Sequence, residues 1–183
     1  MAARRRAFVL LLGLCGVASL PGQTLDLPER GKPELALLAG FGYSVKINRG
    51  STEEQALVLE PQAGFRLGPR FEYLMEGHLA RYFRPDGFAA GLVPVDARYF
   101  FGTGKVAPYL ELGVGFCWTN LDVEEINRRF NFILQGGLGV VGSPERDHTW
   151  TLEARWLHYS NAGTVLPNLG LNTIVLLLGW RFR

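Results

Sequence analysis

The feature that most restricts the fold is a series of eight long strand-like runs. Each is at least as long as the roughly 9–11 residues with which a tilted β-strand crosses a bilayer, whereas globular strands usually have about 5–6. After the N-terminal leader, no segment has the roughly 18 consecutive apolar residues of a membrane helix. The predicted strands cover residues 34–47, 56–67, 71–83, 87–101, 106–119, 129–141, 149–159 and 172–183.

The two faces of these runs differ in polarity. In an extended strand alternate side chains share a face. The last two runs therefore each present an apolar face, and on the seventh run Glu153 and Arg155 lie on the opposite face. An apolar outside, a polar inside and a closed sheet are what a lipid environment requires. The predicted outward residues are Leu152, Ala154, Trp156, Ile174, Leu176, Leu178, Trp180 and Phe182, and Asn172 has the same parity.

The connections alternate in length, which is typical of outer-membrane barrels. Long connections cover residues 47–55, 119–128 and 159–171, and short ones cover 68–70, 102–104 and 142–146. The sequence therefore predicts an all-β fold, an eight-stranded antiparallel transmembrane β-barrel over residues 34–183. A barrel of this size is just filled by its side chains, so a wide pore is not expected.

Composition agrees with a turn-rich β protein, since glycine occurs 23 times and only 20% of residues are charged. The alternative is a soluble barrel of lipocalin type, which would need polar outer faces that these strands lack. The aromatic-rich end, residues 178–182, resembles the terminal strand of outer-membrane barrels.

The N-terminus has the three parts of a secretory signal peptide. Arg4, Arg5 and Arg6 precede the apolar residues 7–14, and small residues follow. We predict a signal peptide over about residues 1–22, a periplasmic segment over 23–33, and export through the periplasm to the outer membrane. Cys15 raises a lipoprotein as an alternative, but bulky Leu14 stands where a small residue is usual.

Without the leader, 16 basic side chains stand against 17 acidic ones, a formal charge of −1. This balance lacks the basic footprint of nucleic-acid binding. Cys117 is the one cysteine after the leader, so no intramolecular disulfide can form. We interpret it as a small apolar strand residue.

His158 and Ser160 have the side chains that a serine esterase requires at minimum. They lie two residues apart and so share a strand face, the outward one, where an imidazole could take a proton from a hydroxyl. With a periplasmic N-terminus, the seventh strand ends at the outer surface, beside the headgroups of the outer leaflet. The alternative is that these residues only mark the membrane interface, where amphipathic side chains gather.

The segment His158–Gly163 (HYSNAG), followed by residues 167–170 (PNLG), resembles the signature of the PagL-type lipid A 3-O-deacylases. This resemblance implies a Gram-negative outer-membrane serine esterase that hydrolyses the 3-O-linked acyl ester of lipid A in lipopolysaccharide, without a cofactor. It implies that Ser160 is the nucleophile and His158 the general base. Asn161, Gly163 and Asn168 match the positions that stabilise the oxyanion or bind substrate.

The sequence departs from the family at the third catalytic position. The family has a glutamate fourteen residues after the histidine, where this chain has Asn172. An asparagine oxygen can still accept the imidazole N–H, as in Cys-His-Asn enzymes, but it supplies no negative charge. We predict Asn172 as the orienting residue, with Asp122, Glu124 or Glu125 as substitutes. The departure also leaves open a non-catalytic barrel with a structural, adhesion or lipid-binding role.

The remaining polar residues indicate barrel structure. His78 and His148 lack ligand-like spacing, so no metal site is predicted. Glu111 and Glu153 are expected to face inward and to pair with arginines such as Arg98, Arg155 or Arg181. The glycines of residues 136–139 indicate bending or close packing within a strand. Whether the chain forms a homodimer is left open.

Overall fold

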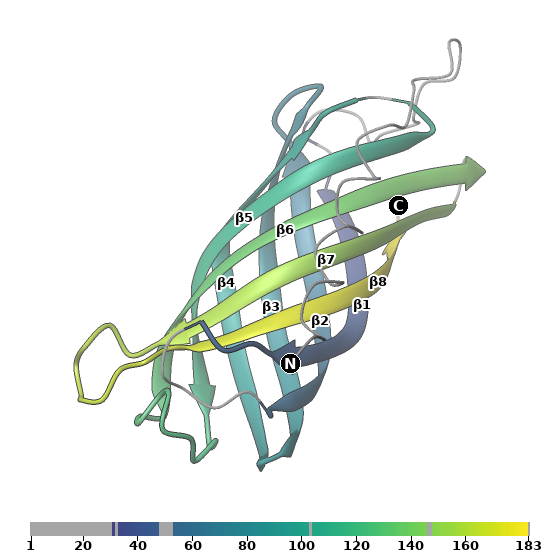
Figure 1. Cartoon of the computed structure of the whole chain (residues 1–183). Coiled ribbons are helices and arrows are strands. Elements are labelled where there is room, and N and C mark those ends of the chain that lie inside the picture. Colours follow the sequence, from purple (N-terminus) through teal and green to yellow (C-terminus); the bar gives the residue numbers. More distant parts are fainter. Residues whose placement is uncertain (1–30, 32, 48–52, 103, 146–147, 183) are drawn as a thin grey trace, which may run out of the picture.

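The computed structural model describes residues 31, 33–47, 53–102, 104–145 and 148–182, which form a closed antiparallel barrel (Figure 1). Each strand pairs with the next, and β1 pairs with β8. The predicted signal peptide lies outside the described residues, as does most of segment 23–33. The strands are β1 (Pro33–Ser44), β2 (Gln55–Arg66), β3 (Phe71–Arg84), β4 (Asp86–Phe100), β5 (Val106–Thr119), β6 (Phe130–Glu145), β7 (His148–Ser160) and β8 (Leu171–Phe182).

The eight predicted strands are confirmed, and the predicted connections are confirmed except for the one after β6. β5 has the predicted bounds at both ends, and the largest shift is at β6, which continues four residues past position 141 to Glu145. Part of the sequence predicted as a turn after β6 therefore belongs to the strand. Within the described residues no helix is long and apolar enough to cross a membrane.

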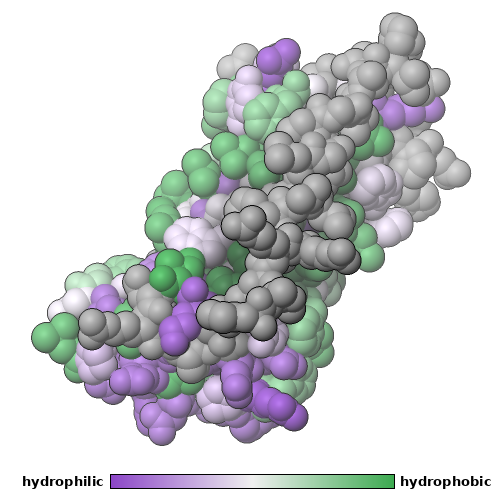
Figure 2. Space-filling model, in the orientation of Figure 1, coloured by the Kyte–Doolittle hydropathy of each residue, from purple (hydrophilic) through white to green (hydrophobic). Residues whose placement is uncertain are grey.

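The barrel wall is apolar on the outside, as the parity predicts. On β8, Leu176 and Leu178 are 62% and 58% exposed, whereas Val175 and Leu177 are completely buried in the interior. Hydrophobic residues follow the wall, and hydrophilic ones gather at the lower end, which carries the β3–β4 and β5–β6 connections (Figure 2). An apolar exterior excludes the lipocalin-type alternative and suits a barrel surrounded by lipid.

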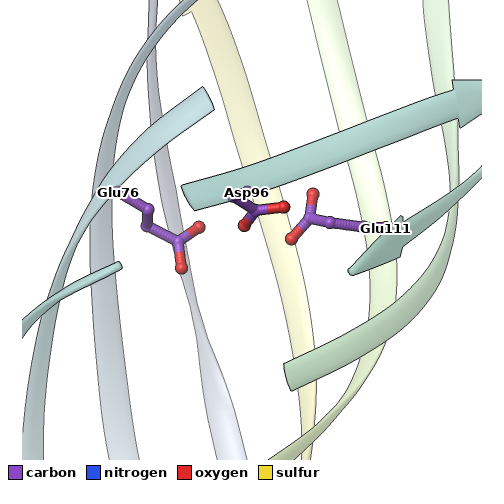
Figure 3. A group of neighbouring side chains, drawn as sticks. All are labelled: Glu76, Asp96 and Glu111. Carbon is purple, nitrogen blue, oxygen red and sulfur yellow. The ribbon is translucent and has the colours of Figure 1, made fainter. Parts of the chain in front are cut away.

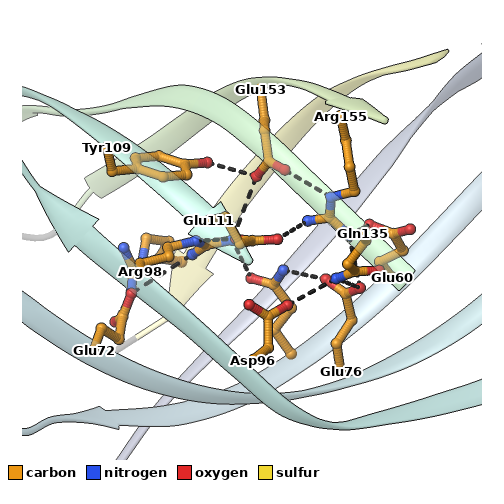
Figure 4. Close-up of polar contacts among 12 residues, drawn as sticks. Glu60, Glu72, Glu76, Asp96, Arg98, Tyr109, Glu111, Gln135, Glu153 and Arg155 are labelled. Carbon is orange, nitrogen blue, oxygen red and sulfur yellow. Dashed lines mark hydrogen bonds and ion pairs between the residues drawn. The ribbon is translucent and has the colours of Figure 1, made fainter. Parts of the chain in front are cut away.

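Charged side chains fill the barrel interior (Figure 4). Arg155 is fully buried and forms ion pairs with four carboxylates. Arg98 is also fully buried and pairs with Glu111, Glu153 and Glu72. The inward positions predicted for Glu111 and Glu153 are thus confirmed, with Arg98 and Arg155 as their partners. Arg181, named as a further partner, pairs instead with Glu34 and Glu72.

A bulge in β4 directs part of this network inward. Ala89 and Val93 face the interior, but the register shifts between Leu92 and Val95, and Asp96 and Arg98 then face inward with the opposite parity. An extra residue in one strand has this effect, and prolines such as Pro94 are tolerated at such sites. The carboxylates of Glu76, Asp96 and Glu111 consequently point toward one another (Figure 3).

Glycines of β6 provide room for these interior side chains. A Cβ atom on Gly137 would lie 2.3 Å from Glu153 Oε1, and one on Gly139 would lie 2.4 Å from the Tyr109 hydroxyl oxygen. That hydroxyl donates a 2.7 Å hydrogen bond to Glu153. The predicted close packing at these glycines is therefore confirmed. Cys117 is buried and free, in agreement with its interpretation as a small strand residue.

Candidate active site

The candidate site lies on the outer face of the wall, where β7 reaches the end with the longer connections. Register pairs His158 with Asn172 on β8 and with Leu134 on β6, and it pairs Ser160 with Phe132. Leu134 and Phe132 are 45% and 47% exposed on the lipid-facing wall. The predicted pair thus has a polar neighbour on one side and an apolar surface on the other.

Asn172 contacts two ring nitrogens of β7. Its side-chain oxygen lies 2.9 Å from Nδ1 of His158 and 3.1 Å from Nε1 of Trp156. Its amide nitrogen donates to the carbonyl of Gly170 at 3.2 Å. Only 5% of Asn172 is exposed, so solvent competes little for these bonds. Asn172 therefore lies within hydrogen-bonding distance of the His158 imidazole, and its orienting role stays a prediction.

The Ser160 hydroxyl is surrounded by hydrogen-bonding groups of the β7–β8 connection. Asn168 Nδ2 and the backbone N–H of Ala162 each donate to Ser160 Oγ at 3.1 Å. Asn168 Oδ1 lies 3.3 Å from the same oxygen and accepts the N–H of Asn161 at 3.1 Å. Among the described residues, Ser160 Oγ bonds to these groups rather than to His158. Catalytic hydrogen bonds often tighten only when substrate is bound, so this geometry is compatible with the predicted pair.

The three predicted oxyanion residues have different surroundings. Asn168 lies beside Ser160 Oγ, as described above. Asn161 and Gly163 form hydrogen bonds within the β7–β8 connection. Gly163 N–H donates to Asn161 Oδ1 at 2.9 Å, and Asn161 Nδ2 donates to the carbonyl of Val165 at 3.0 Å. Ala162 was not predicted from the sequence. Its φ of 54° is uncommon for a residue with a side chain, and it accompanies the N–H contact with Ser160.

Gly170 brings the connection against the face of His158. Its φ is +76°, and a Cβ at this position would lie 2.3 Å from Cε1 of the imidazole. Its N–H donates at 3.0 Å to the backbone carbonyl of Glu125, in the β5–β6 connection. That connection, which was proposed to supply a substitute acid, thus contacts the site through its main chain.

A second histidine supports the same strand from inside the barrel. His78 Nδ1 lies 3.1 Å from Glu60 Oε1, and its Nε2 is hydrogen-bonded to the Tyr159 hydroxyl. Tyr159 lies between His158 and Ser160 in the chain but faces the interior, where it is 1% exposed. The sequence offered only a weak indication that His78 faces the interior, because His78 shares its strand face with Glu72 and Glu76.

A closed eight-stranded barrel with an apolar wall and a charged interior has the architecture of bacterial outer-membrane β-barrels. The model of the lipid A 3-O-deacylase (PagL) family matches residues 39–181. The chain therefore belongs to this family, as its motif predicted, and the family and the barrel indicate the bacterial outer membrane.

Solved barrels show the same fold at low sequence identity. Neisserial surface protein A (NspA) has a TM-score of 0.64 at 15% identity, covering 82% of this chain and 96% of its own. The outer membrane enzyme PagL has a TM-score of 0.60 at 16% identity, covering 80% and 97%. The N-terminal barrel domain of Pseudomonas aeruginosa OprF has a TM-score of 0.51 at 17% identity, covering 87% and 100%. No curated protein sequence matched the chain significantly.

Proposed function

We propose that this barrel is an outer-membrane serine esterase that hydrolyses the 3-O-linked acyl ester of lipid A in Gram-negative bacteria. In this proposal residues 1–22 direct export of the chain. The observation that carries the proposal is the 2.9 Å contact between His158 and Asn172, beside Ser160 on the same outward face. Family membership supports ester hydrolysis of lipid A in particular.

The proposed reaction begins when His158 Nε2 takes the Ser160 proton as Oγ attacks the ester carbonyl carbon. Asn172 holds the imidazole through Nδ1. When the tetrahedral intermediate collapses, the bond to the sugar oxygen breaks and the protonated His158 donates a proton to that oxygen. Water then attacks the acyl-enzyme by the same sequence, which releases the fatty acid and restores Ser160.

The oxyanion requires donors close to Ser160. Asn168 Nδ2 and the Ala162 N–H are the nearest candidates, because both donate to Ser160 Oγ. Asn161 and Gly163 then act indirectly by bracing the connection that carries these donors. This assignment shifts the predicted oxyanion role toward Asn168 and adds Ala162.

The surroundings of the site favour an amphiphilic substrate. Phe132 and Leu134 provide an apolar surface on the lipid-facing wall beside Ser160 and His158. The β7–β8 connection, with the amide side chains of Asn161 and Asn168, lies at the end of the barrel (Figure 1). An ester at the junction between sugar and acyl chains would lie at this level, with its acyl chain along the wall.

The direct test is mass spectrometry of lipid A incubated with the purified barrel in detergent micelles. We expect a product that has lost one ester-linked acyl chain from the 3-position. We expect Asn172→Glu to raise the rate at least about tenfold, because a carboxylate stabilises the imidazolium that an amide leaves unpaired. Unchanged lipid A with both folded proteins would refute the proposal and favour the non-catalytic, lipid-binding barrel that Asn172 suggests.

Gly170→Ala is expected to lower the rate about 100-fold. The new methyl group would displace the imidazole with which it overlaps, and displacements of about 1 Å can cost this much. Gly31→Ala is the matched control, because Gly31 also has a positive φ of 81° but no atom within 4 Å of the added Cβ. Equal rates for Gly170→Ala and the wild type would contradict the proposed position of His158.

A further inference from the structure

Trp156 determines which atom of Asn172 can face the imidazole. Its Nε1 lies 3.1 Å from the Asn172 oxygen, which is also 2.9 Å from His158 Nδ1. An indole N–H can only donate a hydrogen bond. The Asn172 atom opposite Trp156 must therefore be an acceptor, which is the carbonyl oxygen and not the amide nitrogen.

The contact of the Asn172 side-chain nitrogen supports the same orientation of the amide. Its nitrogen lies 3.2 Å from the Gly170 carbonyl, which can only accept. The oxygen and nitrogen of an asparagine amide are nearly equal in size, so only their hydrogen-bond partners distinguish the two orientations. A donor on one side and an acceptor on the other leave one orientation in which both contacts are favourable.

The amide orientation sets the tautomer of His158. An oxygen opposite Nδ1 requires the neutral imidazole to carry its proton on Nδ1, which leaves Nε2 free to take the Ser160 proton. A flipped amide would present its N–H group to Nδ1 and favour the proton on Nε2, where the ring cannot act as the base. A carboxylate has two accepting oxygens and needs no such selection.

We propose that Trp156 is a positioning residue that fixes the Asn172 amide and thereby holds His158 in the tautomer that can act as a base. The inference rests on the proposed role of His158 and explains how a neutral asparagine can serve in place of the family's glutamate. The Trp156 and His158 rings also stack, with centroids 5.5 Å apart and planes 23° apart, which keeps the two N–H groups directed to the same oxygen.

The test is a double-mutant cycle between Trp156→Phe and Asn172→Glu. Trp156→Phe removes the N–H and retains an aromatic ring. We expect kcat to fall about three- to tenfold with Asn172 present, the value of one hydrogen bond, with KM little changed. In the Asn172→Glu background we expect less than about a twofold loss. Trp118→Phe is the control, since Trp118 is an outward tryptophan on β5.

Equal losses of kcat in the two backgrounds, or no loss in either, would overturn the proposal. The nitrogen-15 chemical shifts of the His158 ring supply a readout that does not need activity. We expect Trp156→Phe to increase the share of the Nε2–H tautomer, and an unchanged share would also overturn the proposal. If no variant hydrolyses lipid A but the tautomer shifts, the proposed function fails while the positioning by Trp156 stands.

Discussion

Replacing Ser160 by alanine is expected to lower the rate of lipid A deacylation at least about 1,000-fold. Loss of a nucleophile removes the covalent route and leaves only the catalysis supplied by binding and oxyanion donors. The fold should tolerate the change, because Asn168 keeps its bond to the Asn161 N–H, and Gly163 keeps its bond to Asn161. Mass spectrometry of lipid A after timed incubation measures the rate.

Ser44→Ala is a suitable control for this experiment. Ser44 is a buried serine on β1 whose hydroxyl pairs with Thr173 in the interior, so it cannot reach a lipid at the wall. We expect near-normal rates from it. More than about a tenth of wild-type activity in folded Ser160→Ala protein would assign the nucleophile to another group.

Replacing Arg155 by leucine is expected to destabilise the barrel by at least about 3–5 kcal/mol. Its guanidinium is fully buried and lies 2.6–2.7 Å from carboxylate oxygens of Glu60, Glu76 and Glu153, with Glu111 as a fourth partner. Removing one member of a buried ion pair leaves uncompensated charge in a region that water cannot easily reach. Urea unfolding in detergent micelles, followed by tryptophan fluorescence, measures the loss.

Two comparisons isolate the charge effect at Arg155. Arg81→Leu removes an ion pair with Asp86 whose side chains are 52% and 81% exposed, and it should cost at most about 1 kcal/mol. Adding Glu76→Gln to Arg155→Leu should recover part of the stability, because Arg155 is the arginine with which Glu76 forms its ion pair. No recovery in the double variant would mean that lost packing, and not charge, causes the destabilisation.

The barrel could be predicted from sequence because strand length and parity repeat along the whole chain. Leu176 and Leu178 alternate with buried Val175 and Leu177, and the same rule places His158 and Ser160 on the outer wall. Parity could not be carried through β4, because the bulge before Asp96 inverts it. The arginine partners also depend on which inward residues lie at the same height, which the strand register determines.

The arrangement of the candidate site was predicted in part. The motif identified His158, Ser160 and Asn168, and parity indicated that Asn172 could reach His158, which the register places side by side. The contacts of Gly170 with His158 and Glu125, and of Ala162 with Ser160, depend on the path of a connection that has no periodic pattern. Trp156 was correctly assigned to the outward face, but its bond to Asn172 depends on side-chain geometry.

The outward position of Ser160 has a consequence for how any lipid would reach it. The interior is filled by charged side chains, whereas Ser160 lies on the wall beside Phe132. A substrate would therefore arrive by lateral diffusion within the leaflet, and its product would leave in the same plane. The rate of such an enzyme depends on the mole fraction of substrate in the membrane, and diluting the lipid with inert detergent should slow it even at constant bulk concentration.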